Sequence, residues 1–262
     1  KRTPAITYIT FNMPYLGTHA RVKSLGKSRR GLLGDVMEER DDSVRQVRKT
    51  LEDHGLTKNT LIIFSSENGP WIRFRNTARS KYGEARLHVG YATPFRDGKG
   101  STWDGGHRVP GIFCWPGAIP PNSVEQSPVS TLDILPTLFA LAGAEIPKGR
   151  SIDGRDIRPY LMPAKYKKKV PEFEFYYSAS DNKPSAVRIG PWKMHIRISS
   201  QTGNNYGFKA SRETPLLFQI EQDLGERIDR AKEQKDLVAK MMKKLNTFEA
   251  QVEKEGSFWD AQ

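Results

Sequence analysis

Residues 59–71 read NTLIIFSSENGPW, in which an apolar run leads into a polar turn. Its apolar run, residues 61–64, is short and bounded by polar residues, as expected of a strand covered on both faces in a parallel sheet. The strand ends at residues 65–70, where two side chains that carry oxygen atoms, Glu67 and Asn68, meet a turn. Ligands of open α/β sheets bind beyond the carboxyl ends of strands, so we expect a functional site at this point.

The residues before this strand predict a β-α-β unit. Residues 5–11 (AITYITF) are rich in β-branched and aromatic side chains, which indicates another buried strand. Residues 35–54 have apolar side chains close to helical spacing, with Asp35 as the predicted N-cap and Gly55 as the stop. Strand, helix and strand in this order are typical of an α/β fold.

A glycine-rich segment follows further along the chain. Residues 98–108 (GKGSTWDGGHR) place four glycines around Lys99. Glycine lets the backbone approach a ligand closely, and a lysine among glycines can reach an anion. The local sequence leaves a second interpretation open, in which Lys99 is a surface lysine of a flexible loop. Residues 109–115 then predict a strand, and residues 131–142 (TLDILPTLFALA) predict a helix.

A change of composition at residues 163–169 (PAKYKKK) predicts a domain boundary. We expect residues 1–164 to form the α/β core and residues 165–262 to form a smaller subdomain of antiparallel strands plus a helix.

Two patterns predict the elements of this subdomain. Residues 192–198 alternate apolar and polar side chains, which predicts a strand with one wet face that carries Lys193 and His195. Residues 238–252 have apolar side chains in a 3-4-3-4 spacing, which predicts a closing helix packed on the sheet.

The composition excludes several classes of protein. The net charge of +12 on 262 residues favours anionic partners such as nucleic acid, anionic lipid surfaces, or sulfated and phosphorylated glycans. The single cysteine, Cys114, excludes an internal disulfide. No apolar run approaches the ~20 residues of a membrane-spanning helix, so we expect a soluble chain. No P-loop, GxSxG or GxGxxG pattern is present, and no pair of histidines has the spacing of a zinc helix.

The Glu67-Asn68 pair suggests a cation site. A carboxylate and an amide carbonyl are hard oxygen donors, which suit Ca²⁺ or Mg²⁺. Two ligands do not complete a site, and the sequence Asn68-Gly69-Pro70 is also ordinary turn chemistry, so turn capping is the alternative.

Taken together and in order, six segments resemble the C-terminal portion of the formylglycine-dependent sulfatases, in the alkaline-phosphatase-like superfamily. The resemblance is strongest to the branch that contains arylsulfatase A and N-acetylgalactosamine-6-sulfatase. The matching segments are residues 26–44, 59–71, 95–117, 130–143, 186–195 and 215–226.

This resemblance implies a mixed sheet flanked by helices, with a small C-terminal antiparallel sheet plus helix, and hydrolysis of aryl or carbohydrate sulfate esters. In such enzymes a hydrated formylglycine attacks the sulfur, while a divalent cation, usually Ca²⁺, and basic side chains hold the sulfate oxygens. By the same resemblance, Asn68 and Glu67 are metal ligands and Lys99 contacts the sulfate and the formylglycine. A secreted or lysosomal location is implied as well.

The chain departs from the family pattern at several positions. It has no Cys/Ser-x-Pro-x-Arg segment, which carries the formylglycine precursor, and no N-terminal Asp-Asp metal pair. Tyr15 stands where relatives have a histidine near the leaving group, and His19, four residues on, is the candidate substitute. Glu67 replaces the usual aspartate, which moves the carboxylate by about one bond length.

Two hypotheses of different classes follow. The first is a sulfuric ester hydrolase whose nucleophile is supplied by missing N-terminal sequence or by a partner chain. The second is a catalytically degenerate, sulfatase-like module that binds sulfated glycans through its basic surface. Nucleic-acid binding rests on charge alone, because no groove-reading motif is present. The hydrolase hypothesis requires folding to bring Asn68 and Lys99 into one pocket.

Overall fold

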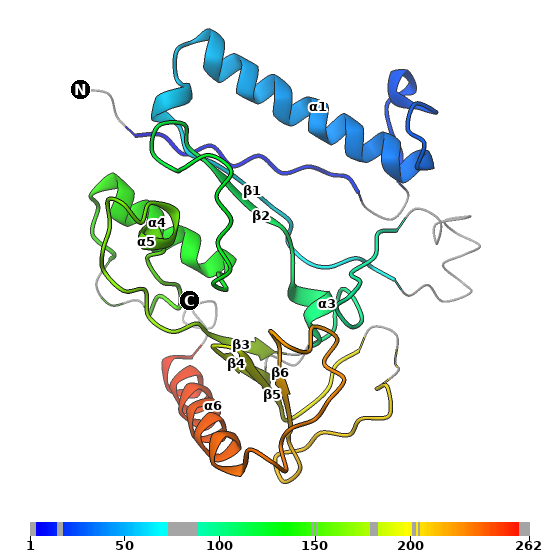
Figure 1. The fold of residues 1–262 in the computed structure, drawn as a ribbon, viewed down its shortest axis with the longest axis vertical. Coiled ribbons are helices and arrows are strands. Elements are labelled where there is room, and N and C mark those ends of the chain that lie inside the picture. The colour runs from blue at the N-terminus through cyan, green and yellow to red at the C-terminus, as the bar shows by residue number, and fades with distance from the viewer. Residues whose placement is uncertain are drawn as a thin grey trace. The chain divides into compact units, whose positions relative to one another are not determined.

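The computed structural model describes residues 4–14, 18–72, 89–147, 149, 151–178, 183–200, 203 and 205–256 (Figure 1). These residues group into two compact units that are not continuous in sequence. Unit 1 comprises Lys1–Ser65, Phe74–Gly90 and Pro110–Pro171, and unit 2 comprises Ser66–Arg73, Tyr91–Val109 and Glu172–Gln262, counting the described residues only. Because such grouping follows packing contacts, the domain boundary predicted after residue 164 stays a prediction.

Unit 1 begins with an extended segment and a long helix. Helix α1 (Gly31–Asp53) follows the short 3-10 helix η1 (Val22–Ser24) and ends before Gly55, which confirms the predicted helix. The predicted N-cap is wrong, because Asp35 lies inside the helix. Its carboxylate instead accepts N–H groups of Ser28, Gly26 and Lys27 in the preceding loop, which lower the pKa of Asp35.

Two short strands form the sheet of unit 1. Strand β1 (Ile62–Ser65) follows the 3-10 helix η2 (Thr57–Asn59) and pairs antiparallel with β2 (Gly111–Cys114). Both predicted strands are therefore present, but the predicted parallel pairing is wrong for the described residues. The partner of a strand and the direction of their pairing depend on contacts between distant segments. An apolar run in the sequence does not reveal these contacts.

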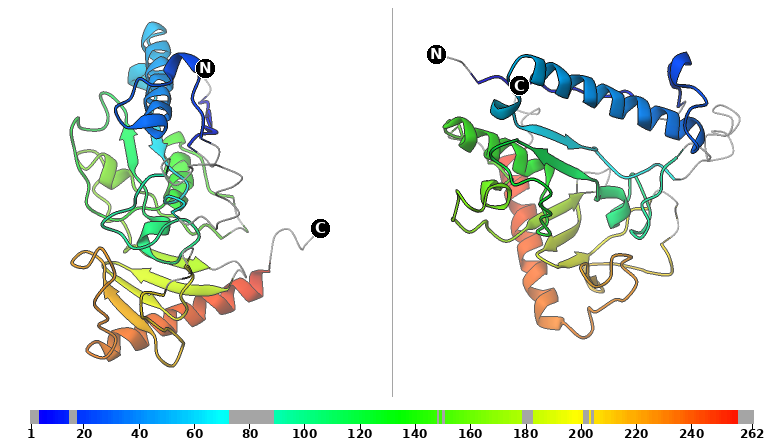
Figure 2. Two further views of the ribbon diagram at one scale, coloured as in Figure 1. Left: turned by 90° about the vertical axis from the view of Figure 1, so that its right-hand side faces the viewer. Right: turned by 45° about the horizontal axis from the view of Figure 1, so that its top comes forward.

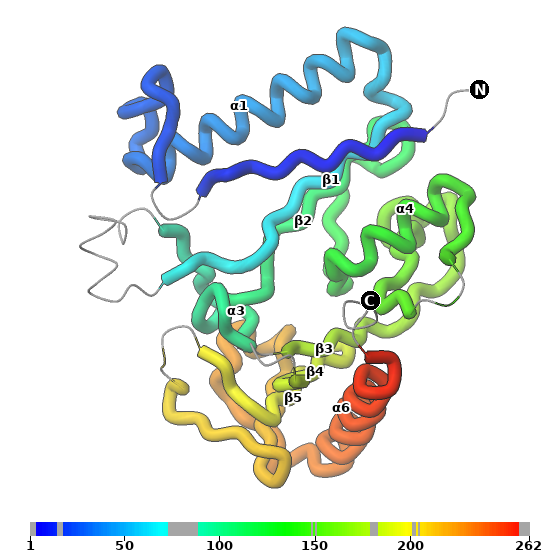
Figure 3. Tube along the Cα trace, turned by 180° about the vertical axis from the view of Figure 1, so that it is seen from behind, coloured from blue at the N-terminus to red at the C-terminus, as the bar shows by residue number. Residues whose placement is uncertain are grey.

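The strand predicted at residues 5–11 is also wrong. This extended segment runs beside α1 and β1 (Figures 1 and 3), yet it joins no sheet in the described residues. Its end is held by Arg40, whose guanidinium donates to the Met13 carbonyl oxygen (2.5 Å) and lies over the rings of Phe11 and Phe64. The apolar side chains Ile6 and Tyr8 are 78% and 88% exposed, because no neighbouring strand of the described chain covers them.

The remaining regular elements of unit 1, in the described residues, are helices joined by irregular segments. The 3-10 turn η4 (Thr131–Asp133) leads into α4 (Ile134–Ala142), and Gly143 ends the helix in the left-handed conformation, as predicted. A further short helix is α5 (Arg158–Leu161). Asp133 fixes the segment between these helices, since its carboxylate accepts both the backbone N–H and the guanidinium of Arg155 (2.6 and 2.8 Å).

Unit 2 contains a four-stranded antiparallel sheet in the order β3-β4-β5-β6. Its strands are β3 (Glu174–Ser178), β4 (Pro184–Ile189), β5 (Trp192–His195) and β6 (Leu216–Gln219). Helix α6 (Lys235–Glu255) lies along one face of the sheet in both views of Figure 2, where Met241 and Leu245 are fully buried. The predicted antiparallel subdomain and its closing helix are thus present.

The predicted wet face of this sheet is wrong. Lys193 and His195 are both 0% exposed. The short helix α3 (Asp104–His107) and the preceding Trp103 pack over them, and the Trp103 and His195 ring centroids are 4.6 Å apart. The alternation of apolar and polar residues therefore indicates which side chains lie on opposite faces of the strand. It does not indicate that a segment distant in sequence covers the polar face.

We expect Leu245→Ala to destabilise the chain by about 2–5 kcal/mol, because Leu245 lies in a closed apolar cluster with Val187 and Met194. Urea denaturation followed by circular dichroism measures this loss. The matched control is Val252→Ala on the same helix, where the side chain is 44% exposed and the expected loss is about 0.5 kcal/mol or less. Equal losses for both variants would contradict the packing of α6 described here.

Candidate functional site

Two loops of unit 2 meet at the predicted site. The loop that contains Glu67 and Asn68 follows β1, and the loop that contains Lys99 precedes α3. The backbone N–H of Lys99 donates to the Pro70 carbonyl oxygen (2.9 Å), so the loops are hydrogen-bonded to each other. The Lys99 ammonium nitrogen lies 3.8 Å from Glu67 Oε1. Residues far apart in the sequence therefore place an ammonium group beside a carboxylate.

Glycines make this approach possible. A Cβ atom on Gly69 would lie 1.7 Å from the Gly105 carbonyl oxygen, and a Cβ atom on Gly98 would lie 2.2 Å from the Pro70 carbonyl oxygen. No side chain fits at such distances. For Gly98 the sequence suggested close approach of a ligand, whereas here both glycines let the two loops contact each other and α3.

The conformation of the Lys99 loop is fixed at both sides of the lysine. Asp97 has a φ of 60°, which is uncommon for a residue with a side chain, and Gly100 has a φ of 80°. The Asp97 carboxylate holds this turn, because Oδ1 accepts the Gly98 N–H (2.9 Å) and Oδ2 accepts the Ser200 hydroxyl (2.5 Å). Lys99 is thus carried by a shaped turn, and its side chain remains 33% exposed.

Of the two roles that the sequence left open for Asn68, the structure shows turn capping, and the role as a metal ligand stays a prediction. Its Nδ2 donates to the Gly69 carbonyl oxygen (2.9 Å), which is turn capping. Capping through the nitrogen directs the side-chain oxygen away from that bond, so the same conformer can still offer a ligand atom. The Glu67 side chain is 80% exposed.

The described residues fit part of a calcium or magnesium site. Glu67 and Asn68 supply two hard oxygen donors, and such cations take six or more ligands. Among the residues that the structure describes, no group of three or more His, Cys, Asp or Glu side chains could hold a metal ion. These two donors alone therefore do not make a complete site.

The other predicted residues lie elsewhere. His19 is exposed and belongs to unit 1, so it is described apart from Lys99. Tyr15 lies outside the described residues. The roles predicted for His19, Glu67, Asn68 and Lys99 stay predictions.

Behind the two loops lies a buried ion cluster, which we define as Asp104, Lys193, His195 and Glu226. The Lys193 ammonium nitrogen lies 2.9 Å from Asp104 Oδ1 and 3.1 Å from Glu226 Oε1. Glu226 Oε1 also accepts a hydrogen bond from His195 Nε2 (2.9 Å). This bond assigns the proton of a neutral His195 to Nε2.

The charges of the cluster stabilise one another. Burial alone would raise the pKa of Asp104, but Lys193, Arg108 and Arg188 together lower it far below its usual range. Burial acts in the same direction on Glu226, and Lys193 with His195 reverses it, so its pKa is lowered too. Lys193 is desolvated, yet both carboxylates raise its pKa. The cluster is therefore an ammonium group shared by two carboxylates.

Sequence reasoning missed this cluster. Lys193 and His195 were placed on a wet face, and neither Asp104 nor Glu226 belongs to a pattern that indicates burial. The one available signal was Trp103 beside Asp104, because a large aromatic residue next to an acid in a glycine-rich segment suggests that the acid enters a core.

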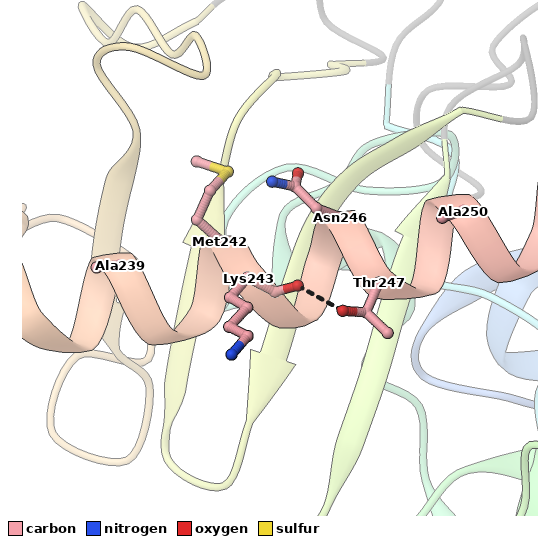
Figure 4. A pocket seen from close by; sticks show the side chains of 6 residues that line it. All are labelled: Ala239, Met242, Lys243, Asn246, Thr247 and Ala250. Carbon is pink, nitrogen blue, oxygen red and sulfur yellow. Dashed lines mark hydrogen bonds between the residues drawn. The ribbon is translucent and has the colours of Figure 1, made fainter.

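A shallow groove lies on the outer face of α6 and is separate from the candidate site. Figure 4 shows its lining, which comes from this helix alone and includes the Thr247 hydroxyl that donates to the Lys243 carbonyl oxygen (2.9 Å). The lining residues are Ala239, Met242, Lys243, Asn246, Thr247 and Ala250. None of the predicted site residues is among them.

Fold and site define a mixed α/β protein of the alkaline-phosphatase-like class, in which an ammonium group and oxygen donors share an exposed loop site. The sulfatase family profile matches residues 10–144, and a profile described as the C-terminal region of aryl-sulfatase matches residues 169–260. The chain belongs to the sulfatase family. This finding confirms the resemblance identified from the six segments.

Curated relatives and solved structures agree with this assignment. Steryl-sulfatase of Rattus norvegicus is 37% identical over 86% of this chain and 41% of its own length. Arylsulfatase A of Bos taurus is 34% identical over 90% of this chain and 47% of its own length. The crystal structure of the PsFucS1 sulfatase from Pseudoalteromonas sp. has a TM-score of 0.71 at 25% identity and covers 89% of this chain and 46% of that chain. The chain spans less than half the length of these relatives.

We expect acid to destabilise the chain through His195. Burial lowers the pKa of His195, and the Lys193 charge adds to this, against the opposing hydrogen bond to Glu226. The unfolded chain takes up a proton near pH 6.5, so the contribution of neutral His195 is complete above about pH 6.5 and is lost as the pH falls below it. The lowered pKa values of Asp104 and Glu226 act in a lower range, below about pH 4.3.

Urea denaturation between about pH 7 and about pH 5 tests this expectation. His195→Gln keeps an Nε donor toward Glu226 without the titration, so its free energy of unfolding should fall less steeply with pH than that of the wild type. Met194→Leu, a change beside His195 that leaves every titrating group in place, is the control and keeps the wild-type slope. An unchanged slope in His195→Gln would show that His195 does not carry the effect.

Proposed function

We propose that this chain forms part of an enzyme that hydrolyses sulfate esters. The observation that carries the proposal is the meeting of the Lys99 loop with the loop that contains Glu67 and Asn68, which places the Lys99 ammonium nitrogen 3.8 Å from the Glu67 carboxylate. Membership of the sulfatase family supports the same reaction class. Sulfated small molecules or glycans are the substrates that such a site accepts.

Lys99 binds the sulfate group in this proposal. A sulfate ester carries a negative charge on its oxygens, and that charge shifts during cleavage of the S–O bond. An ammonium group held in place by a fixed turn stabilises such a charge without reorganisation. Lys99 fits because its backbone is fixed by Asp97 and Pro70 while its side chain remains reachable.

Glu67 and Asn68 would contribute two oxygen ligands to a divalent cation, Ca²⁺ or Mg²⁺. When bound, such a cation neutralises charge on the sulfate oxygens. The Glu67 carboxylate lies 3.8 Å from the Lys99 ammonium nitrogen and its side chain is 80% exposed. Because two donors are too few, further ligands would be needed to complete the site, and we derive no catalytic step through the cation.

The nucleophile also comes from outside these 262 residues in this proposal, since no Cys/Ser-x-Pro-x-Arg segment is present. Missing N-terminal sequence or a partner chain would supply it as formylglycine. His19 is proposed as the group that protonates the leaving oxygen. A secreted or lysosomal location is the corresponding proposal for the compartment.

The second candidate function is binding of sulfated glycans without hydrolysis. The net charge of +12 and the replacement of aspartate by Glu67 favour it. In this case Lys99 still holds a sulfate group, but no bond is broken. The two candidates therefore share the binding site and differ in turnover.

Hydrolysis is tested on the natural polypeptide that contains this sequence, produced with the formylglycine-generating enzyme and supplied with Ca²⁺. We expect turnover of an aryl sulfate or a sulfated sugar, and Lys99→Ala should reduce kcat/KM by roughly 10²–10³-fold, as for removal of one anion-stabilising donor. Lys243→Ala on the outer face of α6 is the matched control and keeps the wild-type rate. Absence of turnover on every sulfate ester, with formylglycine formed, would refute the enzyme proposal.

Binding without hydrolysis is tested on the same protein with a sulfated oligosaccharide. Binding through charged groups weakens as salt screens them. The dissociation constant should therefore increase when the salt concentration is raised from about 0.05 M to about 0.2 M. Lys99→Ala should weaken binding at both salt concentrations, whereas Lys243→Ala should not. Equal binding by Lys99→Ala and the wild type would place the glycan elsewhere on the surface.

A further inference from the structure

The loop that carries Lys99 lies on α3. Immediately before the loop, the Arg96 carbonyl oxygen accepts the N–H of Gly105 in α3 (2.8 Å). On the other side of α3, the carbonyl oxygen of Gly106 accepts the N–H of Gly69, next to Asn68 (3.0 Å). One short helix thus sets the positions of both loops of the candidate site.

Helix α3 is in turn held by the buried ion cluster. The backbone N–H of Asp104, its first residue, donates to Glu226 Oε2 (2.7 Å). The Asp104 carboxylate binds the Lys193 ammonium group from β5 (2.9 Å). Glu226 uses its other oxygen for Lys193 and His195, so a single carboxylate joins the helix start to the sheet. Four residues make too short a helix to hold this position by themselves.

The same sheet also reaches the far end of the Lys99 loop. After β5, the Ser199 carbonyl oxygen accepts the N–H of Thr102 (3.0 Å), and the Ser199 hydroxyl donates to the Gly100 carbonyl oxygen (3.2 Å). Strand β5 therefore fixes the loop through Lys193 and α3, and the segment that follows β5 fixes it again through Ser199. The lysine that we assign to the sulfate lies between these two attachments.

Stability alone does not explain the cluster. Buried charges cost desolvation free energy, and apolar side chains of similar volume often stabilise a core equally well or better. The charges restrict the relative positions of the groups, because two carboxylates and one ammonium group can all be paired in only a few arrangements. The arrangement found here determines where α3 begins.

We propose that Lys193 and Glu226 are positioning residues of the sulfate site, which act on Lys99 through Asp104 and α3. This inference rests on the function proposed above. The small C-terminal sheet then has a part in the reaction, because its interior sets the position of the Lys99 ammonium group relative to Glu67 and Asn68. Neither Lys193 nor Glu226 touches the substrate.

The test is a double-mutant cycle between Glu226→Gln and Lys99→Ala in the natural polypeptide. A displacement of about 1 Å in a positioned group costs roughly up to 100-fold in rate, so Glu226→Gln alone should lower kcat by roughly 10–100-fold with little change in KM. In the Lys99→Ala background the same change should alter kcat by less than about twofold, because the group that it positions is gone. Equal losses in both backgrounds would overturn the inference.

Two further variants separate positioning from loss of folding. Leu245→Ala weakens the opposite face of the same sheet, and its kcat per folded molecule should equal that of the wild type. Glu226→Asp keeps the charge and shortens the side chain, so it replaces Glu226→Gln if that variant does not fold. Glu226→Asp should also lower kcat in the wild-type background and leave it nearly unchanged in the Lys99→Ala background. An equal loss of kcat in both backgrounds would again overturn the inference.

A binding measurement distinguishes failure of this inference from failure of the proposed function. Inorganic sulfate is titrated into the same four proteins by calorimetry. If the wild type binds sulfate but hydrolyses no sulfate ester, the enzyme proposal fails. The double-mutant cycle is then evaluated from the dissociation constants for sulfate, and non-additive effects of the two substitutions on these constants again support positioning. A wild type that neither binds sulfate nor hydrolyses a sulfate ester would overturn both.

Discussion

The ammonium group of Lys193 lies inside unit 2 between the carboxylates of Asp104 and Glu226, and much of that unit is arranged around it. Strand β5 supplies the cation, and α3 and the segment after β6 supply the anions. None of these three parts could be moved without leaving a buried charge unpaired, which is far more costly than losing an exposed contact. The interaction therefore restricts unit 2 to one arrangement of sheet, helix and loops.

Local patterns predicted the local elements. Helices α1, α4 and α6 and strands β1, β2 and β5 were found from apolar spacing and from stop signals such as Gly143, because these depend on neighbours in sequence. Pairing was not predicted: β1 has an antiparallel partner, and residues 5–11 join no sheet in the described chain. Both depend on contacts between distant segments, which hydrophobic periodicity does not encode.

The candidate site was predicted in a different way. Nothing in the local sequence around Glu67 or Lys99 required the two residues to lie close together. A turn-capping role explained the sequence around Glu67 equally well, and a surface position explained that around Lys99. The ordered set of six segments supplied the missing long-range information. What it did not supply was the support behind the site, because Lys193 occupies a position in an alternating strand that is ordinarily solvated, and its burial follows from the packing of Trp103 and α3 over β5.

The extended segment at residues 5–11 has a consequence for handling the chain. It is uncharged, contains no proline and is rich in residues that favour strands, and it exposes Ile6 and Tyr8. Such a stretch is a template for intermolecular β-sheet formation. Concentrated solutions of these 262 residues would self-associate through it, and a charged substitution at Tyr8 is the simplest way to keep the material monodisperse.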